Sequence, residues 1–151
     1  MHPSEKIHVA TFADLDNADL YAILKLRVDV FVVEQACAYP EIDGRDDEAG
    51  TRHVWVTGDG AILAYLRILD VDRAPRIGRV VTAVSARKGG YASRLMAHAL
   101  TVVGERTVTL EAQEHLTGFY GRFGFVVAGA GYLEDGIPHV PMIREVPPRS
   151  R

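Results

Sequence analysis

Residues 87–93 combine two basic side chains, two glycines and the start of a helical pattern. They follow a β-branched segment that ends at Val84, and apolar residues then recur at helical spacing as far as Leu100. Adjacent glycines let the backbone turn tightly and approach a ligand, and the first amides of a helix have no partner within it. Beside Arg87 and Lys88, these amides predict an anion site, most simply for a pyrophosphate. A plain chain reversal would use the same glycines, so other parts of the sequence are needed to distinguish an anion site from an ordinary turn.

Two other phosphate-binding patterns are excluded. The P-loop spacing G-x-x-x-x-G-K-[ST] is absent, because no Lys-Ser or Lys-Thr pair follows a glycine. The dinucleotide fingerprint G-x-G-x-x-G is absent as well, and strands and helices alternate too little for a dinucleotide-binding fold. A nucleotide-binding domain of either kind is therefore disfavoured.

A second candidate site is the acidic loop at residues 41–48. Pro40 and Gly44 interrupt regular structure there. Such a charge run is most often a solvated surface loop, but it could also form a mouth that attracts a cationic amine. Metal binding is a third interpretation, but the spacing does not match a calcium loop, and no metal site is expected. The five carboxylates are those of Glu41, Asp43, Asp46, Asp47 and Glu48.

The elements that position these residues follow from the hydrophobic pattern. A helix is expected to begin after Asp16, whose side chain caps it with Asp19 as an acidic partner, and to carry an apolar stripe to Phe31. Arg27 lies within that stripe, where a snorkelling side chain is the simplest interpretation. Two further helices are expected at residues 91–103 and 115–122. Strands are expected at residues 7–12, 53–57, 61–69, 79–84, 107–112, 125–128 and 140–144, with a loop at residues 131–138.

This order predicts one α/β (mixed α+β) domain spanning residues 1–151. Three successive strands followed by strand–helix alternation imply a mixed, mostly antiparallel sheet of about six or seven strands, with helices on both faces. The length of 151 residues suits one compact domain, and 48% hydrophobic with 25% charged residues are ordinary for a globular protein. The last five residues are expected to be frayed.

Composition also limits the kinds of binding partner and the cellular location that can be expected. A formal net charge of −3 gives no general attraction to nucleic acid or to an anionic membrane. Cys37 is the only cysteine, so neither an intrachain disulfide nor a cysteine metal cluster is expected. No apolar run approaches the roughly 20 residues of a membrane span, and the N-terminus lacks the apolar core of a signal peptide, so a cytoplasmic location is expected.

Four motifs resemble one known superfamily. Residues 87–92 read R-x-x-G-x-A and resemble the R/Q-x-x-G-x-G/A motif of GNAT N-acetyltransferases, with Ala92 in place of the commoner glycine. Residues 119–125, F-Y-G-R-F-G-F, resemble that superfamily's FYxxxGF element. Residues 26–48 with His53 look like the ElaA branch, and so does L-E-D-G-I-P-H at residues 133–139. The positions that match the ElaA pattern are Arg27, Val30, Phe31, Glu34, Gln35, Cys37, Tyr39, Asp43, Asp46 and His53, whereas Ala38 replaces the usual proline.

The resemblance implies the GNAT fold and acetyl-CoA as the cosubstrate. The loop amides would hold the pyrophosphate. The preceding strand would pair with the pantetheine as an added strand would, although ordinary strand pairing is the alternative there. Gln113 lies where many relatives have an asparagine that touches the cofactor. The expected cofactor-binding residues are Thr82, Ala83, Val84, Arg87, Lys88, Gly89, Gly90, Tyr91, Ala92, Ser93, Gln113 and Tyr120.

The resemblance further implies acetyl transfer to a primary amine by direct attack in a ternary complex. Tyr120 matches the tyrosine that often serves as general acid, and a phenol with a reference pKa of about 10 is protonated at neutral pH. Glu34 joins it as an expected catalytic residue, more for substrate orientation than as a base. The base stays open between Glu34, Glu111 and His53. The residues expected to contact the acceptor are Arg27, Glu34, Gln35, His53 and Glu111.

The acceptor is expected to be a small cationic amine of unspecified identity. The alternative is a non-catalytic module that senses acyl-CoA without turning it over. A homodimer is possible through an exposed strand edge or through the C-terminal hairpin.

Overall fold

The computed structural model of the protein describes residues 4–146. Among these residues no helix is both long and apolar enough to cross a bilayer. The C-terminal residues expected to be frayed, 147–151, lie outside the described range. The elements in chain order are β1 (Lys6–Ala10), a 3-10 helix (Phe12–Asp14), α1 (Asn17–Arg27), a π-helix (Val28–Glu34), β2 (Arg52–Gly58), β3 (Ala61–Leu69), β4 (Arg76–Thr82), a 3-10 helix (Val84–Ala86), α2 (Tyr91–Val103), β5 (Val108–Gln113), a 3-10 helix (Glu114–Leu116), α3 (Thr117–Gly121), β6 (Val126–Val127), β7 (Tyr132–Glu134) and β8 (Ile137–Arg144).

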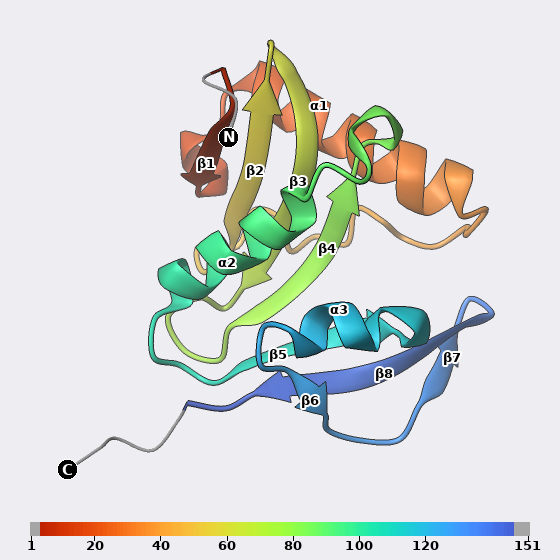
Figure 1. The fold of residues 1–151 in the computed structure, drawn as a ribbon. Helices are drawn as coiled ribbons and strands as arrows, with labels where there is room; N and C mark the ends of the chain where they lie inside the picture. The colour runs from red at the N-terminus through yellow and green to blue at the C-terminus, as the bar shows by residue number, and fades with distance from the viewer. Residues whose placement is uncertain (1–3, 147–151) are drawn as a thin grey trace.

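All eight of these strands form one mixed sheet (Figure 1). Its order is β1-β2-β3-β4-β5-β8-β6, and β7 pairs with β8. Every pair is antiparallel except β4 with β5, which needs a crossover connection that α2 supplies. The predicted mixed, mostly antiparallel sheet is confirmed, with one strand more than the upper estimate.

Helices cover both faces of the sheet, as predicted. Side chains alternate between the faces along each strand, so neighbouring residues enter different cores. Trp55 and Tyr65 pack with α1 residues such as Ile23 on one face. Val54 and Leu66 pack on the other face, where α2 and the aromatic residues in and after α3 complete the larger core.

The first helix runs directly into a wider one. Asp16 caps α1 as predicted, accepting a hydrogen bond from the Asp19 amide at 2.7 Å. Arg27 at the end of α1 keeps helical backbone angles, and the chain continues as the π-helix. Gln35 donates its amide to the Val30 carbonyl at 3.0 Å, which is the i→i−5 bond of that helix type. The π-helix ends at Glu34, and Gln35 follows it in the segment that leads to the acidic loop.

The predicted loop at residues 131–138 is wrong. It contains β7 and the start of β8, which pair from Tyr132 with His139 to Glu134 with Ile137. Asp135 and Gly136 connect them as a two-residue turn with φ of 49° and 78°. Positive φ at both central residues is what a type I′ hairpin turn requires, and an Asp-Gly pair supplies it.

Three predicted strands are shorter than expected at their C-terminal ends, and the smallest difference is in β6, which ends at Val127 instead of at residue 128. β1 ends at Ala10 because the chain turns into a 3-10 helix at Phe12. β4 ends at Thr82, and Val84 begins the next 3-10 helix rather than continuing the strand.

Candidate active site

The central feature of the sheet is the divergence of β4 and β5. These parallel strands pair only at Arg76 with Thr109 and at Ile77 with Leu110. Beyond that point β4 follows β3 and β5 follows β8, and Figure 1 shows the two strands diverging. The facing edges of both strands therefore offer backbone groups to an extended ligand, in the way that a sheet edge accepts an added strand.

The predicted anion loop lies at the end of β4. Gly90 caps α2 with a φ of 76°, and Lys88 also has a positive φ, of 70°. The first intrahelical bond runs from the Arg94 amide to the Gly90 carbonyl at 3.1 Å, so the amides of residues 91–93 precede the hydrogen-bond ladder. No acidic side chain occupies the first turn. The loop keeps free donors at the positive end of the helix, as an anion site requires.

The three residues expected to pair with the pantetheine differ in whether their backbone groups are free to bond a ligand. The Ala83 amide donates to the Leu63 carbonyl at 2.9 Å, so it pairs with β3 and is not free. Backbone direction alternates along a strand, and Thr82 therefore presents its polar groups toward the gap. Val84 lies in the 3-10 helix with an exposed side chain. The expectation is thus contradicted for the Ala83 amide, because β3 already uses that donor, whereas Thr82 remains available.

A cleft of about 350 Å³ lies at the divergence. Tyr120 lines it and is 7% exposed, and its hydroxyl has no hydrogen-bond partner among residues 4–146. Phe119 and Phe125 contact the Tyr120 ring edge-on, with distances between ring centroids of 5.1 and 6.4 Å. Burial raises the pKa of Tyr120 to about 12, so the phenol is protonated at neutral pH.

Two amide side chains meet in the same cleft. Gln113 donates to the Gln35 side-chain oxygen at 3.4 Å, which joins the end of β5 to the end of the π-helix. Both were expected at the site, and the structure places them together with Tyr120 in the lining.

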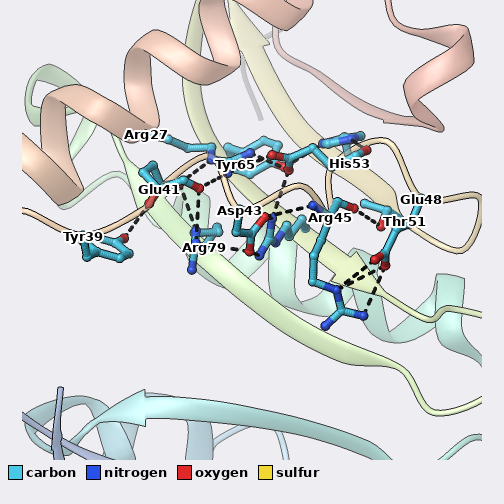
Figure 2. Close-up of polar contacts among 12 residues, drawn as sticks. Arg27, Tyr39, Glu41, Asp43, Arg45, Glu48, Thr51, His53, Tyr65 and Arg79 are labelled. Atoms are coloured by element: carbon cyan, nitrogen blue, oxygen red, sulfur yellow. Dashed lines mark hydrogen bonds and ion pairs between the residues drawn. The ribbon is translucent and has the colours of Figure 1, made fainter.

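The acidic loop is neutralised from within the protein (Figure 2). Arg27 is fully buried and donates to Glu41 at 2.6 Å and to Asp46 at 2.7 Å. Burial opposes its charge, but the hydrogen bonds and charges of these carboxylates prevail and raise the pKa of Arg27. Arg27 is therefore not a snorkelling side chain. The expectation that it contacts the acceptor is contradicted, because it is inaccessible and its charge is balanced.

Two further arginines complete this network. Arg67 pairs with Asp43 and, at 3.1 Å, with Asp46, while Arg79 donates to Glu41 at 2.9 Å. Burial opposes the charge of Asp43, but hydrogen bonds from Arg67 and from the Arg45 amide hold the pKa of this carboxyl well below its usual range. This charge balance argues against the alternative interpretation of the loop as a mouth that attracts a cationic amine.

His53 supports the loop rather than facing a substrate. It is fully buried; its Nε2 lies 3.0 Å from the Asp46 carbonyl and its Nδ1 lies 2.7 Å from the Tyr65 hydroxyl. The carbonyl can only accept, so Nε2 carries the hydrogen and Nδ1 accepts from Tyr65. Its assignment as a base or acceptor ligand is contradicted, because both ring nitrogens are occupied away from solvent.

His53 also predicts how stability depends on pH. Burial lowers its pKa, so the unfolded state binds the proton more readily. Its contribution is fully present above the unfolded pKa of about 6.5 and is lost as the pH falls toward the lower folded value. Urea unfolding should show a falling free energy between about pH 7.5 and pH 5, with a slope of at most about 1.4 kcal/mol per pH unit from this group. A His53→Gln variant with an unchanged slope would contradict the assignment.

The remaining expected residues are Glu34, Arg87 and Glu111. Arg87 donates to Glu34 at 2.7 Å, and this hydrogen bond lowers the pKa of Glu34, which makes it a weaker base. Glu111 faces the cleft, accepts from the Tyr132 hydroxyl at 2.8 Å and lies 3.8 Å from Arg76. No group of three or more potential metal ligands occurs among residues 4–146.

Sequence reasoning missed Arg67, Arg79 and Tyr65. Arg67 carried a usable signal, because a charged residue within the apolar run of β3 must find a buried partner. Arg79 and Tyr65 showed no such pattern.

Comparisons with known proteins agree with this architecture. A model of the acetyltransferase (GNAT) domain matches residues 23–146. The chain therefore belongs to the GNAT acetyltransferase family and is an acyltransferase enzyme, which confirms the predicted family.

Its similar relatives include the ElaA proteins. The chain is 42% identical over 141 residues to protein ElaA of Escherichia coli strain K12, covering 89% of this chain and 92% of ElaA. It is 50% identical over 136 residues to a UPF0039 protein of Mycobacterium tuberculosis, covering 87% of each. The crystal structure of an acyl-CoA N-acyltransferase from Pseudomonas aeruginosa has a TM-score of 0.89 at 45% identity, covering 93% of this chain and 99% of that one.

Proposed function

We propose that this enzyme transfers an acetyl group from acetyl-CoA to a primary amine of a small acceptor, by direct attack in a ternary complex. The observation that carries the proposal is the Tyr120 hydroxyl, which has no partner among the described residues and lies on a mostly buried ring that lines the cleft where β4 and β5 diverge. A hydroxyl that the protein leaves unpaired in a cleft is free to donate to a ligand.

The cofactor would lie along the gap between the strands. Its pyrophosphate would take the amides of residues 91–93, and its pantetheine would pair with the free backbone edge of β4, including Thr82. Gln113 would complete the contacts from β5. The thioester would then lie in the cleft near Tyr120.

The reaction needs an uncharged amine and a good leaving group. The amine nitrogen attacks the thioester carbonyl, a C–N bond forms and the C–S bond breaks. Tyr120 donates its proton to the departing thiolate, and the proton lost by the new amide nitrogen restores the phenol. A phenol with a pKa of about 12 is protonated at neutral pH, as a general acid must be before it donates.

The acceptor would still be cationic, but the carboxylates that attract it would be those of the β7–β8 hairpin and not those of the acidic loop. Glu134 and Asp135, in the β7–β8 hairpin, line the cleft and form no ion pair with the rest of residues 4–146. Glu111 adds a third carboxylate. Arg45, Arg67, Arg76 and Arg79 also line the cleft, so the unpaired Glu134 and Asp135 are the carboxylates that favour an amine that arrives protonated.

Isothermal titration with acetyl-CoA, beside ATP and NAD, tests the cofactor assignment. Selective binding of acetyl-CoA is expected. Equal or absent binding of all three would mean that the loop is an ordinary turn.

Gly90→Asp should weaken acetyl-CoA binding by at least about tenfold, because a carboxylate would stand among the amides that hold the pyrophosphate. Gly60→Asp is the matched control. Gly60 has a φ of 79° against 76° for Gly90, both positions have open space for a Cβ atom, and Gly60 lies in the β2–β3 hairpin turn. Equal affinities of the two variants would overturn the loop assignment.

A further inference from the structure

His139 is a cleft residue to which no role has yet been given. It lies on β8, where it pairs with Gln113 of β5 on one side and with Tyr132 of β7 on the other. It lines the same cleft as Tyr120 and is partly buried. A histidine that lines this cleft can take up a proton from a bound amine.

The structure shows which nitrogen of its ring carries a hydrogen. Nδ1 lies 2.8 Å from the Ile137 carbonyl, which can only accept a hydrogen bond. Nδ1 therefore carries the hydrogen, and in the neutral ring Nε2 has a free lone pair. No other residue of the described part of the chain bonds to Nε2. The Tyr132 ring stacks on the imidazole at 5.8 Å with an interplanar angle of 19°, which holds its orientation.

The three bases that the sequence left open are already engaged. His53 is buried with both ring nitrogens bonded. Glu34 pairs with Arg87. Glu111 accepts from Tyr132 and lies near Arg76. By contrast, His139 offers the cleft an unoccupied proton acceptor on a rigid strand.

We propose that His139 is the general base that removes the proton from the acceptor ammonium before attack. The inference rests on the proposed function and deepens it. One N–H bond of the ammonium breaks and its proton forms an N–H bond at His139 Nε2. The freed electron pair attacks the thioester carbonyl. Tyr120 supplies the proton of the released thiol, and the imidazolium later returns its proton to water.

Two small nucleophiles of similar size separate this role from a structural one. At about pH 9, ethylamine is still mostly protonated, as expected for an alkylamine with a pKa near 10, whereas hydrazine, a much weaker base, is mostly uncharged. His139→Asn keeps an amide near Nδ1 to donate to the Ile137 carbonyl but removes Nε2. We expect this variant to lose about 10²-fold in thiol release from acetyl-CoA with ethylamine and to retain the wild-type rate with hydrazine.

His8→Gln is the matched control. His8 is also partly buried and stacked on an aromatic ring, Trp55 at 5.0 Å, but it lies on β1 and does not line the cleft. This variant should keep the wild-type rate with both nucleophiles. His139→Gln, assayed in the same way, replaces His139→Asn if the latter does not fold.

The remaining outcomes overturn the inference. An undiminished rate with ethylamine in both His139 variants would show that another group takes the proton. Equal loss with both nucleophiles would assign His139 a structural role. A wild-type enzyme that binds acetyl-CoA but releases thiol with neither nucleophile would overturn the proposed transfer itself.

Discussion

Tyr120→Phe is expected to bind acetyl-CoA with wild-type affinity and to lose about 10²-fold in kcat. The substitution removes one oxygen atom and keeps the ring that packs between Phe119 and Phe125. The hydroxyl makes no hydrogen bond within residues 4–146, so folding should not suffer from its loss. Steady-state thiol release at a saturating amine, together with calorimetry, separates the loss of kcat from any change in affinity.

Tyr21→Phe is the control for that experiment, because Tyr21 is 74% exposed on α1 and does not line the cleft. It should leave both quantities unchanged. A wild-type kcat in Tyr120→Phe would remove the tyrosine from the proton-transfer step, and a large loss of acetyl-CoA affinity would make it a binding residue instead.

Arg27→Met is expected to lower the free energy of unfolding by about 3 kcal/mol. The loss of a buried cation leaves Glu41 and Asp46 inside the protein with less compensation. Removing one partner of a buried ion pair typically costs about 3–5 kcal/mol. The lower end applies because Arg79 still pairs with Glu41 and Arg67 still pairs with Asp46.

Lys25→Met supplies the comparison within the same helix. Lys25 pairs with Asp29 four residues later, and both side chains are exposed. Exposed pairs contribute little, so this variant should unfold near the wild-type urea concentration. Equal urea midpoints for the two variants would show that the network around Arg27 does not hold the acidic loop.

The sequence allowed the anion loop and the family to be predicted because both depend on local patterns. Residues 87–92 carry the basic side chains, glycines and helix start in one continuous segment. Tyr120 was found in the same way, within the aromatic motif at residues 119–125. Strand and helix periods placed most elements, whereas the Asp135-Gly136 turn was assigned to a loop although its residue pair is typical of hairpins.

The charge balance of the site could not be predicted from such patterns. The acidic loop at residues 41–48 looks solvated or cation-binding until Arg27, Arg67 and Arg79 are brought to it by three different elements. The β4–β5 divergence is likewise a property of pairing between strands rather than of either strand alone. His139 gained its proposed role only when β8 was placed beside β5, with its ring oriented by Ile137 and Tyr132.

Amine-dependent thiol release from acetyl-CoA tests the central claim most directly. The purified enzyme would be incubated with acetyl-CoA and with polyamines, aminoglycosides, amino acids and short peptides in turn, and mass spectrometry would follow the acceptor. The proposed function predicts that at least one amine gains an acetyl group in step with the release of one equivalent of thiol. Binding of acetyl-CoA without release for any amine would contradict catalysis and would favour a module that senses acyl-CoA.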